Sequence, residues 1–90
     1  MQQSKVNVEA ITAERGGQYG DFAEQGVIAQ DLKVRMRQCP GWHKLSPHQR
    51  ESLEMIQHKI SRILNGDPNV VDSWADIAGY AHIVAIRIQK

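Results

Sequence analysis

Apolar residues recur at helical spacing along most of the chain, most clearly in the segment from Pro47 to about Asn65. Ser46 as N-cap, proline at the next position and Gln49 three residues after the cap form a capping box, which marks the start of a helix. Gly66, with a proline shortly after it, marks the end. The apolar positions of this predicted helix share one side: Leu53, Ile56, Ile60, Ile63 and Leu64.

The C-terminal segment predicts another helix, from about Val70 or Asp72 to near the end of the sequence. Only residues 67–69 connect it to the preceding helix, so the two should form an antiparallel hairpin. Residues 74–86 are apolar around most of the helix circumference, and such a helix needs burial on more than one side. Neighbouring helices or a second subunit can provide this cover, and we favour a homo-oligomer.

The N-terminal part predicts two further helices separated by a glycine-rich break. The first runs from about Val6 to Glu14. Residues 15–20, Arg-Gly-Gly-Gln-Tyr-Gly, should end it, because glycine favours backbone conformations that helices do not use. The second begins with Asp21 as its N-cap and reaches about Gln38. Its approximate apolar stripe comprises Phe22, Ile28, Leu32 and Met36.

These elements predict an all-α fold, a small bundle of about four helices in a single domain over residues 1–90. The net charge is +1 with acids and bases interspersed, so nucleic acid is not an expected partner. No apolar run approaches the ~20 residues needed to span a bilayer, and the N-terminus does not resemble a signal peptide. We therefore expect a cytoplasmic protein without a membrane partner. Cys39 is the only cysteine, which excludes an intrachain disulfide.

Two pairs of carboxylates are candidates for chemistry. Glu51 and Glu54 share a face of one predicted helix, and Asp72 and Asp76 share a face of the next. If the hairpin brings the pairs together, their oxygens suit Mg²⁺, which can bridge phosphate oxygens and activate a water. The alternative for Glu51 and Glu54 is an ordinary solvated helix face. Asp72 can equally be an N-cap.

Asp76 lies within an apolar helix, where an unpaired carboxylate is costly, so it should have a partner. Lys59, Arg62 or a metal ion can be the partner of this carboxylate. A structural salt bridge and a functional ligand both fit this pattern. The same two readings apply to Lys59, which lies among apolar neighbours.

The glycine-rich segment 15–20 can wrap a phosphate with its backbone N–H groups at the start of the next helix. It lacks the Gly-Lys-Ser/Thr ending of a P-loop, and a plain interhelical turn is the favoured interpretation.

Several motifs occur in a fixed order: Arg15-x-x-x-Tyr19-Gly20-Asp21, Lys59-Ile60-Ser61-Arg62 and Asp72-x-x-x-Asp76-Ile77-Ala78-Gly79-Tyr80-Ala81. This set resembles a family of small uncharacterised proteins encoded by tailed phages and prophages. That family is similar, more distantly, to phage dATP/dGTP diphosphohydrolases and to MazG-like all-α NTP pyrophosphohydrolases, which carry Glu-x-x-Glu followed by Glu-x-x-Asp. Here Glu51-x-x-Glu54 fits the first half, whereas Asp72-x-x-x-Asp76 differs from the second in spacing.

The resemblance implies a location in the host cytoplasm, a homo-oligomer, Mg²⁺ and a nucleotide or small phosphorylated ligand. The implied metal ligands are Glu51, Glu54, Asp72 and Asp76. The implied catalytic residues are Glu51, Glu54 and Asp76. The implied nucleotide-binding residues are Arg15, Tyr19, Lys59, Arg62 and Tyr80. Two functions stay open: a Mg²⁺-dependent nucleoside triphosphate pyrophosphohydrolase, and a non-catalytic phage module that captures a nucleotide or a host protein.

Overall fold

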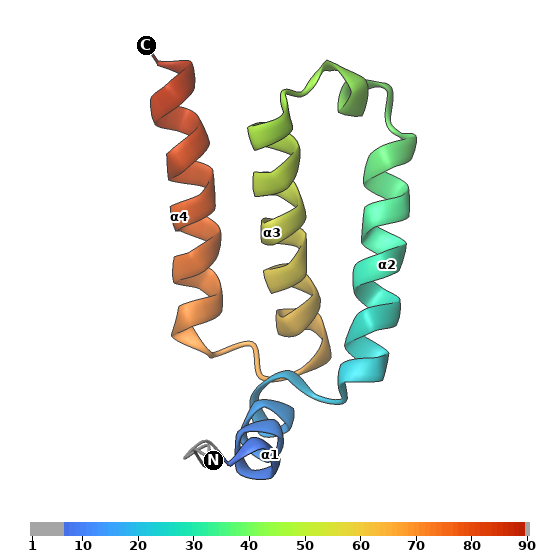
Figure 1. Ribbon diagram of the computed structural model, residues 1–90, viewed down its shortest axis with the longest axis vertical. Coiled ribbons are helices and arrows are strands. Elements are labelled where there is room, and N and C mark those ends of the chain that lie inside the picture. The colour runs from blue at the N-terminus through green and yellow to red at the C-terminus, as the bar shows by residue number, and fades with distance from the viewer. Residues whose placement is uncertain (1–6, 90) are drawn as a thin grey trace, which may run out of the picture.

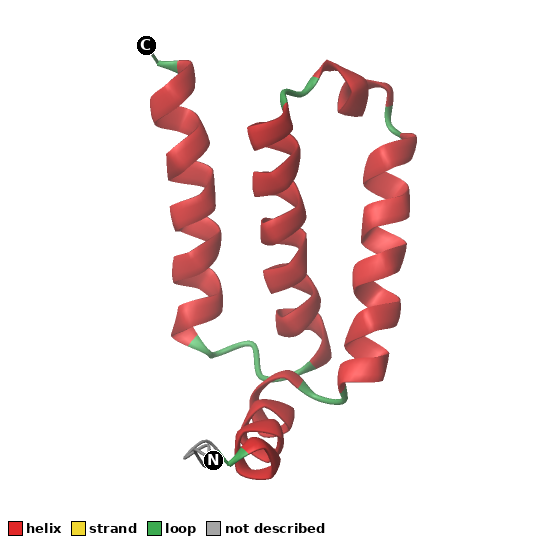
Figure 2. Ribbon diagram, viewed as in Figure 1, coloured by secondary structure: helices red, strands yellow, loops and turns green. Residues whose placement is uncertain are grey.

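The computed structural model describes residues 7–89, and this part of the chain is almost entirely helical (Figure 2). It contains no strand, so the all-α prediction is confirmed for the described residues. The elements are α1 (Val8–Tyr19), α2 (Phe22–Gln38), the short 3-10 helix η1 (Pro40–Lys44), α3 (Pro47–Asn65) and α4 (Val71–Ile88). None of the helices within residues 7–89 is long and apolar enough to cross a bilayer.

Helices α2, α3 and α4 stand side by side in one layer with α3 in the middle, and α1 lies across one end of this layer (Figure 1). Neighbouring helices in the layer run in opposite directions (Figure 1). The predicted antiparallel hairpin of α3 and α4 is therefore confirmed, and α3 is packed against both α2 and α4. Each long helix of the layer therefore has at least one side that no other helix of the layer covers (Figure 1).

Helix α3 begins and ends at the predicted residues because its boundaries are encoded locally. The backbone N–H of Ser46 donates to Oε1 of Gln49 at 2.9 Å, which is the reciprocal half of the capping box. Pro47 occupies the first helical position, where the absence of an N–H group costs nothing. At the other end, the Gly66 N–H bonds to the Arg62 carbonyl at 3.0 Å. Both ends of α3 are therefore determined by residues close to them in sequence.

The predicted glycine break in the first helix was wrong. Helix α1 continues through Gly16 and Gly17 to Tyr19, and the chain turns only at Gly20, whose φ is 79°. Glycine inside a helix costs about 1 kcal/mol relative to alanine but does not forbid the helix. The start predicted at Val6 lies outside the described residues; within them, Asn7 accepts from the Ala10 N–H at 3.0 Å as the N-cap.

The end of α1 is held by the turn between α3 and α4. The side-chain amide of Asn65 donates to the carbonyls of Tyr19 and Asp21, at 2.8 and 2.9 Å. The Asp67 N–H donates to the Gln18 carbonyl at 2.7 Å. Asp21 occupies the N-cap position of α2 as predicted, although its side chain makes no capping hydrogen bond. These long-range bonds fix α1 across the base of the layer.

The interior of the described chain is small and mostly polar. Ala29 is its only buried hydrophobic residue. The buried polar residues are Gln25, Ser52, Gln57, Ser61 and Ser73. The predicted burial of α4 on more than one side is not found among residues 7–89, since α4 packs on α3 and leaves Trp74 55% and Ile83 53% exposed. The predicted stripe of α2 is also not fully buried, because Phe22 is 76% exposed.

Contacts of the middle helix show which of its sides meet neighbours. Toward α2, the Ser61 hydroxyl oxygen accepts from the Gln25 amide at 3.4 Å. Toward α4, the Ser52 hydroxyl donates to the Tyr80 carbonyl at 2.9 Å. Nine residues separate the two serines, which places them on opposite sides of an α-helix. The two remaining sides of α3 therefore lie on the two opposite faces of the layer.

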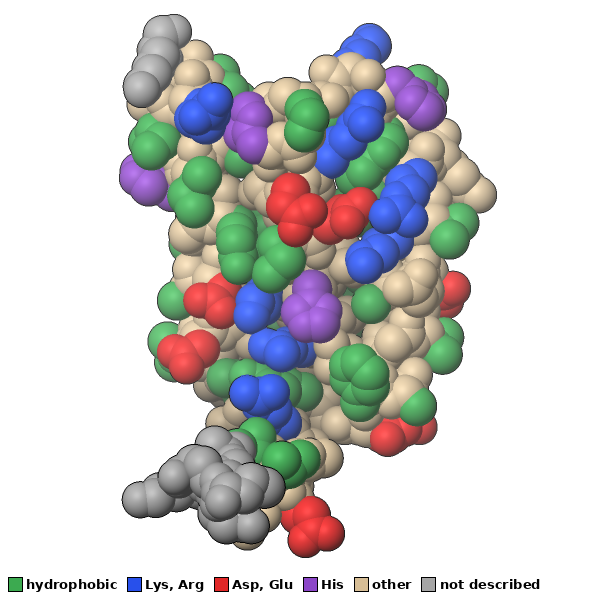
Figure 3. Space-filling view, viewed as in Figure 1, with side chains coloured by type: hydrophobic (Ala, Val, Ile, Leu, Met, Phe, Trp, Pro, Cys, Tyr) green, Lys and Arg blue, Asp and Glu red, His purple; other side chains and the backbone are tan. Residues whose placement is uncertain are grey.

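These two outward sides of α3 differ sharply in chemistry. Helical periodicity places the following residues on one of them: Glu51, Glu54, His58 and Arg62. It places the following residues on the other: Leu53, Ile56, Ile60 and Leu64. We call these the charged face and the apolar face of the layer. Figure 3 looks onto the charged face, where acidic, basic and histidine side chains gather over α3.

Candidate functional site

Basic side chains concentrate on the lower part of the charged face, toward α1. Burial lowers the pKa of His58 below its usual value, and the nearby charges of Arg62, Lys59 and Lys33 lower it further. His58 is therefore neutral at physiological pH and adds no charge to the group. Arg62 of α3 and Lys33 of α2 therefore contribute positive charge to this region, which favours an anion there.

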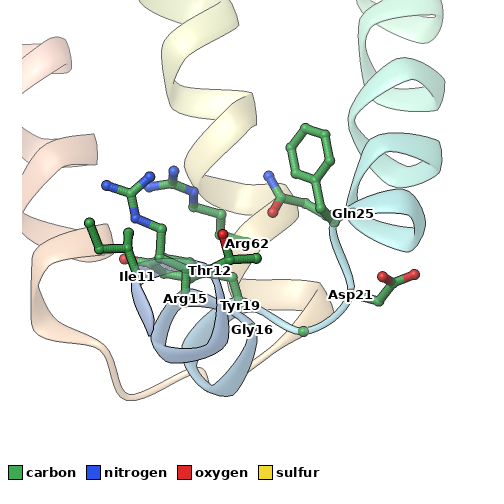
Figure 4. Close-up of a pocket in the computed structure, with 10 residues that line it drawn as sticks. Ile11, Thr12, Arg15, Gly16, Tyr19, Asp21, Gln25 and Arg62 are labelled. Carbon is green, nitrogen blue, oxygen red and sulfur yellow. The ribbon is translucent and has the colours of Figure 1, made fainter. Parts of the chain in front are cut away.

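A pocket of about 350 Å³ opens where α1, the start of α2 and α3 meet. Its lining includes Arg15 and Tyr19 from α1, Gln25 from α2 and Arg62 from α3. Figure 4 shows the side chains of Arg15 and Arg62 reaching toward the same region from their two helices. The structure thus brings together three residues that the resemblance named as nucleotide-binding, and it does so by folding α1 across the base of the layer.

Arg62 is held in place by an aromatic ring. Its guanidinium carbon lies 4.4 Å from the centroid of the Tyr19 ring, within cation–π range. Its Nε atom is buried and makes no hydrogen bond to another described residue. The stacking restricts the side chain while leaving donors of the planar guanidinium available, and planar donors suit the oxygens of a phosphate or carboxylate.

The two arginines have no acidic partner within residues 7–89. Asp21 also lines the pocket but forms no ion pair with either guanidinium. Two like charges sharing one pocket repel each other, and an anion bound between them would remove that repulsion. The pocket therefore favours a negatively charged ligand.

Lys59 and Asp76, both candidates from the sequence, form an ion pair with Nζ and Oδ2 3.1 Å apart. Asp76 has one of the partners expected for it, but the expectation that Asp76 is itself buried was wrong. The Asp76 side chain is 48% exposed and that of Lys59 is 12% exposed. Asp76 lies where α4 borders the charged face, because the contact with α3 covers another side of α4. The salt bridge is the interpretation that the contacts support, and it leaves Lys59 with an acidic partner.

The four carboxylates do not converge. In an antiparallel hairpin, residues meet only when they lie equally far from the turn; Glu51 and Glu54 are near the start of α3, far from the turn, whereas Asp72 directly follows it. Glu54 instead pairs with Arg37 of α2 at 2.8 Å. Residues 7–89 contain no group of three or more His, Cys, Asp or Glu placed to hold a metal ion. These residues therefore do not fit a four-carboxylate Mg²⁺ site within one chain.

Tyr80 lies away from the arginine pocket. Its carbonyl accepts from Ser52, which precedes Arg62 by ten residues on α3, a rise of about 15 Å along the helix. The nucleotide-binding role that the resemblance implied for Tyr80 has no support in this geometry.

A second, smaller pocket of about 240 Å³ lies on the charged face and is lined by both glutamates of the Glu-x-x-Glu motif. Gln57 and His58 also line it, and both were missed from the sequence. Gln57 is only 3% exposed, and neither amide atom finds a hydrogen-bond partner among the described residues. A glutamine within an amphipathic helix gives no signal of such burial. Gln25, which lines the first pocket, was missed for the same reason.

Comparison with known proteins places the chain in a family without placing it beside a characterised relative. No curated protein and no solved structure matches it significantly. Residues 5–87 match a family described as a domain of unknown function, DUF6378. Because this match covers nearly the whole sequence, the chain belongs to the DUF6378 family.

Proposed function

We propose that this protein binds a nucleotide through its phosphate groups in the pocket between Arg15 and Arg62. The observation that carries the proposal is the convergence of two guanidinium groups that lack an acidic partner within residues 7–89. Guanidinium binds phosphate oxygens in a bidentate manner. A pocket of about 350 Å³ is also within the size range of small-ligand sites.

The surroundings of the pocket support a phosphate ligand over a neutral one. Lys33 extends the positive region along the charged face, as its effect on the pKa of His58 indicates, whereas the charge of Lys59 is balanced by Asp76. The stacking of Arg62 on Tyr19 reduces the entropy that the side chain loses on binding. The proposal also agrees with the resemblance of the sequence to nucleotide-processing MazG-like proteins.

Capture of the nucleotide fits the arrangement better than its hydrolysis. A metal-dependent hydrolase needs carboxylates gathered beside the phosphates, and here Glu54 pairs with Arg37 while Asp76 pairs with Lys59. Glu51 and Glu54 share the charged face with Arg62 but lie about two to three helical turns away along α3. We therefore propose a binding protein as the primary function.

The test measures binding of (deoxy)nucleoside triphosphates to the wild type and to Arg15→Gln and Arg62→Gln by thermal shift and calorimetry. Each substitution removes a charge-assisted contact to phosphate, so we expect affinity to fall by about ten- to a hundredfold. Arg87→Gln is the matched control, because Arg87 is an exposed arginine of α4 outside the pocket. Its affinity should equal that of the wild type.

Equal binding by Arg62→Gln and the wild type would refute the site. The same samples, with Mg²⁺ or Mn²⁺ added, should release no pyrophosphate. Turnover that disappears in both Glu54→Gln and Asp76→Asn would contradict the binding-only function and establish the enzyme.

A further inference from the structure

The apolar face of the layer has no cover within the described chain. On α3, Leu53 is 40% exposed, Ile60 37% and Leu64 64%. On α4, Asp76 borders the charged face, and helical periodicity places three residues on the opposite side: Trp74, Ala81 and Ile88. Trp74 is 55% and Ile88 64% exposed. Two adjacent helices thus present a continuous apolar surface.

The described chain lacks the apolar interior that normally stabilises a domain. Ala29 is its only buried hydrophobic residue, whereas apolar burial is the main favourable term in folding. Serine and glutamine side chains fill the contacts between the helices instead. The large apolar residues that a core requires are present in the sequence, and several of them lie on the apolar face.

The chain exposes more surface than a compact monomer of its mass. The chain exposes 6749 Å², whereas a compact monomer of 10.2 kDa exposes about 5,300 Å². Its radius of gyration is 15.9 Å, against about 12 Å for a compact chain of this length. If two copies buried this excess of about 1,400 Å² each, the interface would total about 2,800 Å², which is within the range of obligate homodimers.

We propose that a second copy of this chain packs on the apolar face, so that the two layers form one shared hydrophobic core. A two-fold interface sets a surface against itself, and an uncharged apolar surface suits this because it meets no like charge in its copy. The apolar positions of α3 and α4 meet this condition, because no charged residue interrupts either set. The charged face, carrying the arginine pocket, stays open to solvent in both copies.

The test compares two substitutions at equally exposed apolar residues. Leu64 on the apolar face and Val27 on the outer side of α2 are both 64% exposed, so glutamate at either should perturb an isolated chain equally little. Light scattering after size exclusion should give the wild type and Val27→Glu about twice the 10.2 kDa chain mass. Leu64→Glu should elute as a monomer or lose its helical circular dichroism, because its core depends on the partner.

Concentration dependence keeps the proposal testable if Leu64→Glu does not fold. The thermal midpoint of a wild-type dimer rises with protein concentration, whereas that of a monomer does not. A wild type with the single-chain mass and a concentration-independent midpoint would overturn the proposal. A dimer that persists in Leu64→Glu would overturn this choice of surface.

Discussion

At the scale of single residues, burial separates groups that look equivalent in sequence. Lys59 and Asp76 both lie among apolar neighbours in the sequence, yet the lysine is nearly buried and the aspartate half exposed. A buried ammonium needs a counter-charge more than an exposed carboxylate does. We infer that Asp76 is the counter-ion of the nearly buried Lys59, and that this ion pair stabilises the α3–α4 hairpin.

His58 reports on the charges around the arginine pocket. Burial, followed by the charge of Arg62, lowers its pKa, so the neutral form is favoured in the folded state. Its contribution to stability is present above its unfolded pKa of about 6.5 and is lost as the pH falls through the lowered folded pKa. We expect the pKa of His58 to rise toward the ordinary value in Arg62→Gln. Titration of its ring resonances by NMR measures this shift.

Arg87→Gln again serves as the control and should leave the titration of His58 unchanged. An unchanged pKa in Arg62→Gln would show that the guanidinium does not act on His58, and the electrostatic description of the charged face would then be wrong.

Sequence reasoning found part of the site and missed the rest for a physical reason. Arg15, Tyr19 and Arg62 were named from ordered motifs, and the structure brings these three together. Gln25 and Gln57 were missed, because a polar residue in a helix signals neither burial nor a neighbour from another helix. Which polar side chains meet depends on how the helices pack, and local pattern does not encode this.

At the scale of elements, local signals predicted some boundaries and tertiary contacts decided others. Both ends of α3 were predicted correctly from its capping box and its terminal glycine. The end of α1 was not, because it depends on Asn65 and Asp67, which are distant in sequence. Glycine at position 66 is required there, since a Cβ would collide with the backbone of Gln18 and Tyr19.

Two glycine-to-alanine substitutions test this contact between α1 and the α3–α4 turn. Gly66→Ala forces the turn away from α1, and we expect it to lower the free energy of unfolding by about 2 kcal/mol. Gly17→Ala, in open space within α1, should raise it by about 0.5 kcal/mol. Denaturant unfolding followed by circular dichroism measures both changes.

The structure predicts that the free energy of unfolding falls in Gly66→Ala and rises in Gly17→Ala. Destabilisation by both variants would mean that α1 does not continue through its glycines, and a neutral Gly66→Ala would mean that the turn does not contact α1.

At the scale of the whole molecule, the layer of helices carries charged side chains on one face and apolar side chains on the other. The all-α class and the antiparallel hairpin were predictable, because periodicity and the short connection encode them. The open layer was not, since periodicity shows that a helix has an apolar side but not what covers it. The unusual apolarity of α4 was the sequence signal for missing cover, and among the described residues its cover comes mainly from α3.

The central claim is that the pocket between Arg15 and Arg62 binds phosphate groups, and the most direct test is calorimetric titration with matched ligands. A nucleoside lacks the phosphate groups that the arginines are proposed to contact, its triphosphate carries them together with the nucleoside, and inorganic triphosphate carries them alone. We predict that both triphosphates bind the wild type, that the nucleoside does not, and that Arg62→Gln weakens the phosphate-dependent binding. Binding that is equal for nucleoside and triphosphate, or absent for all three, would contradict the account.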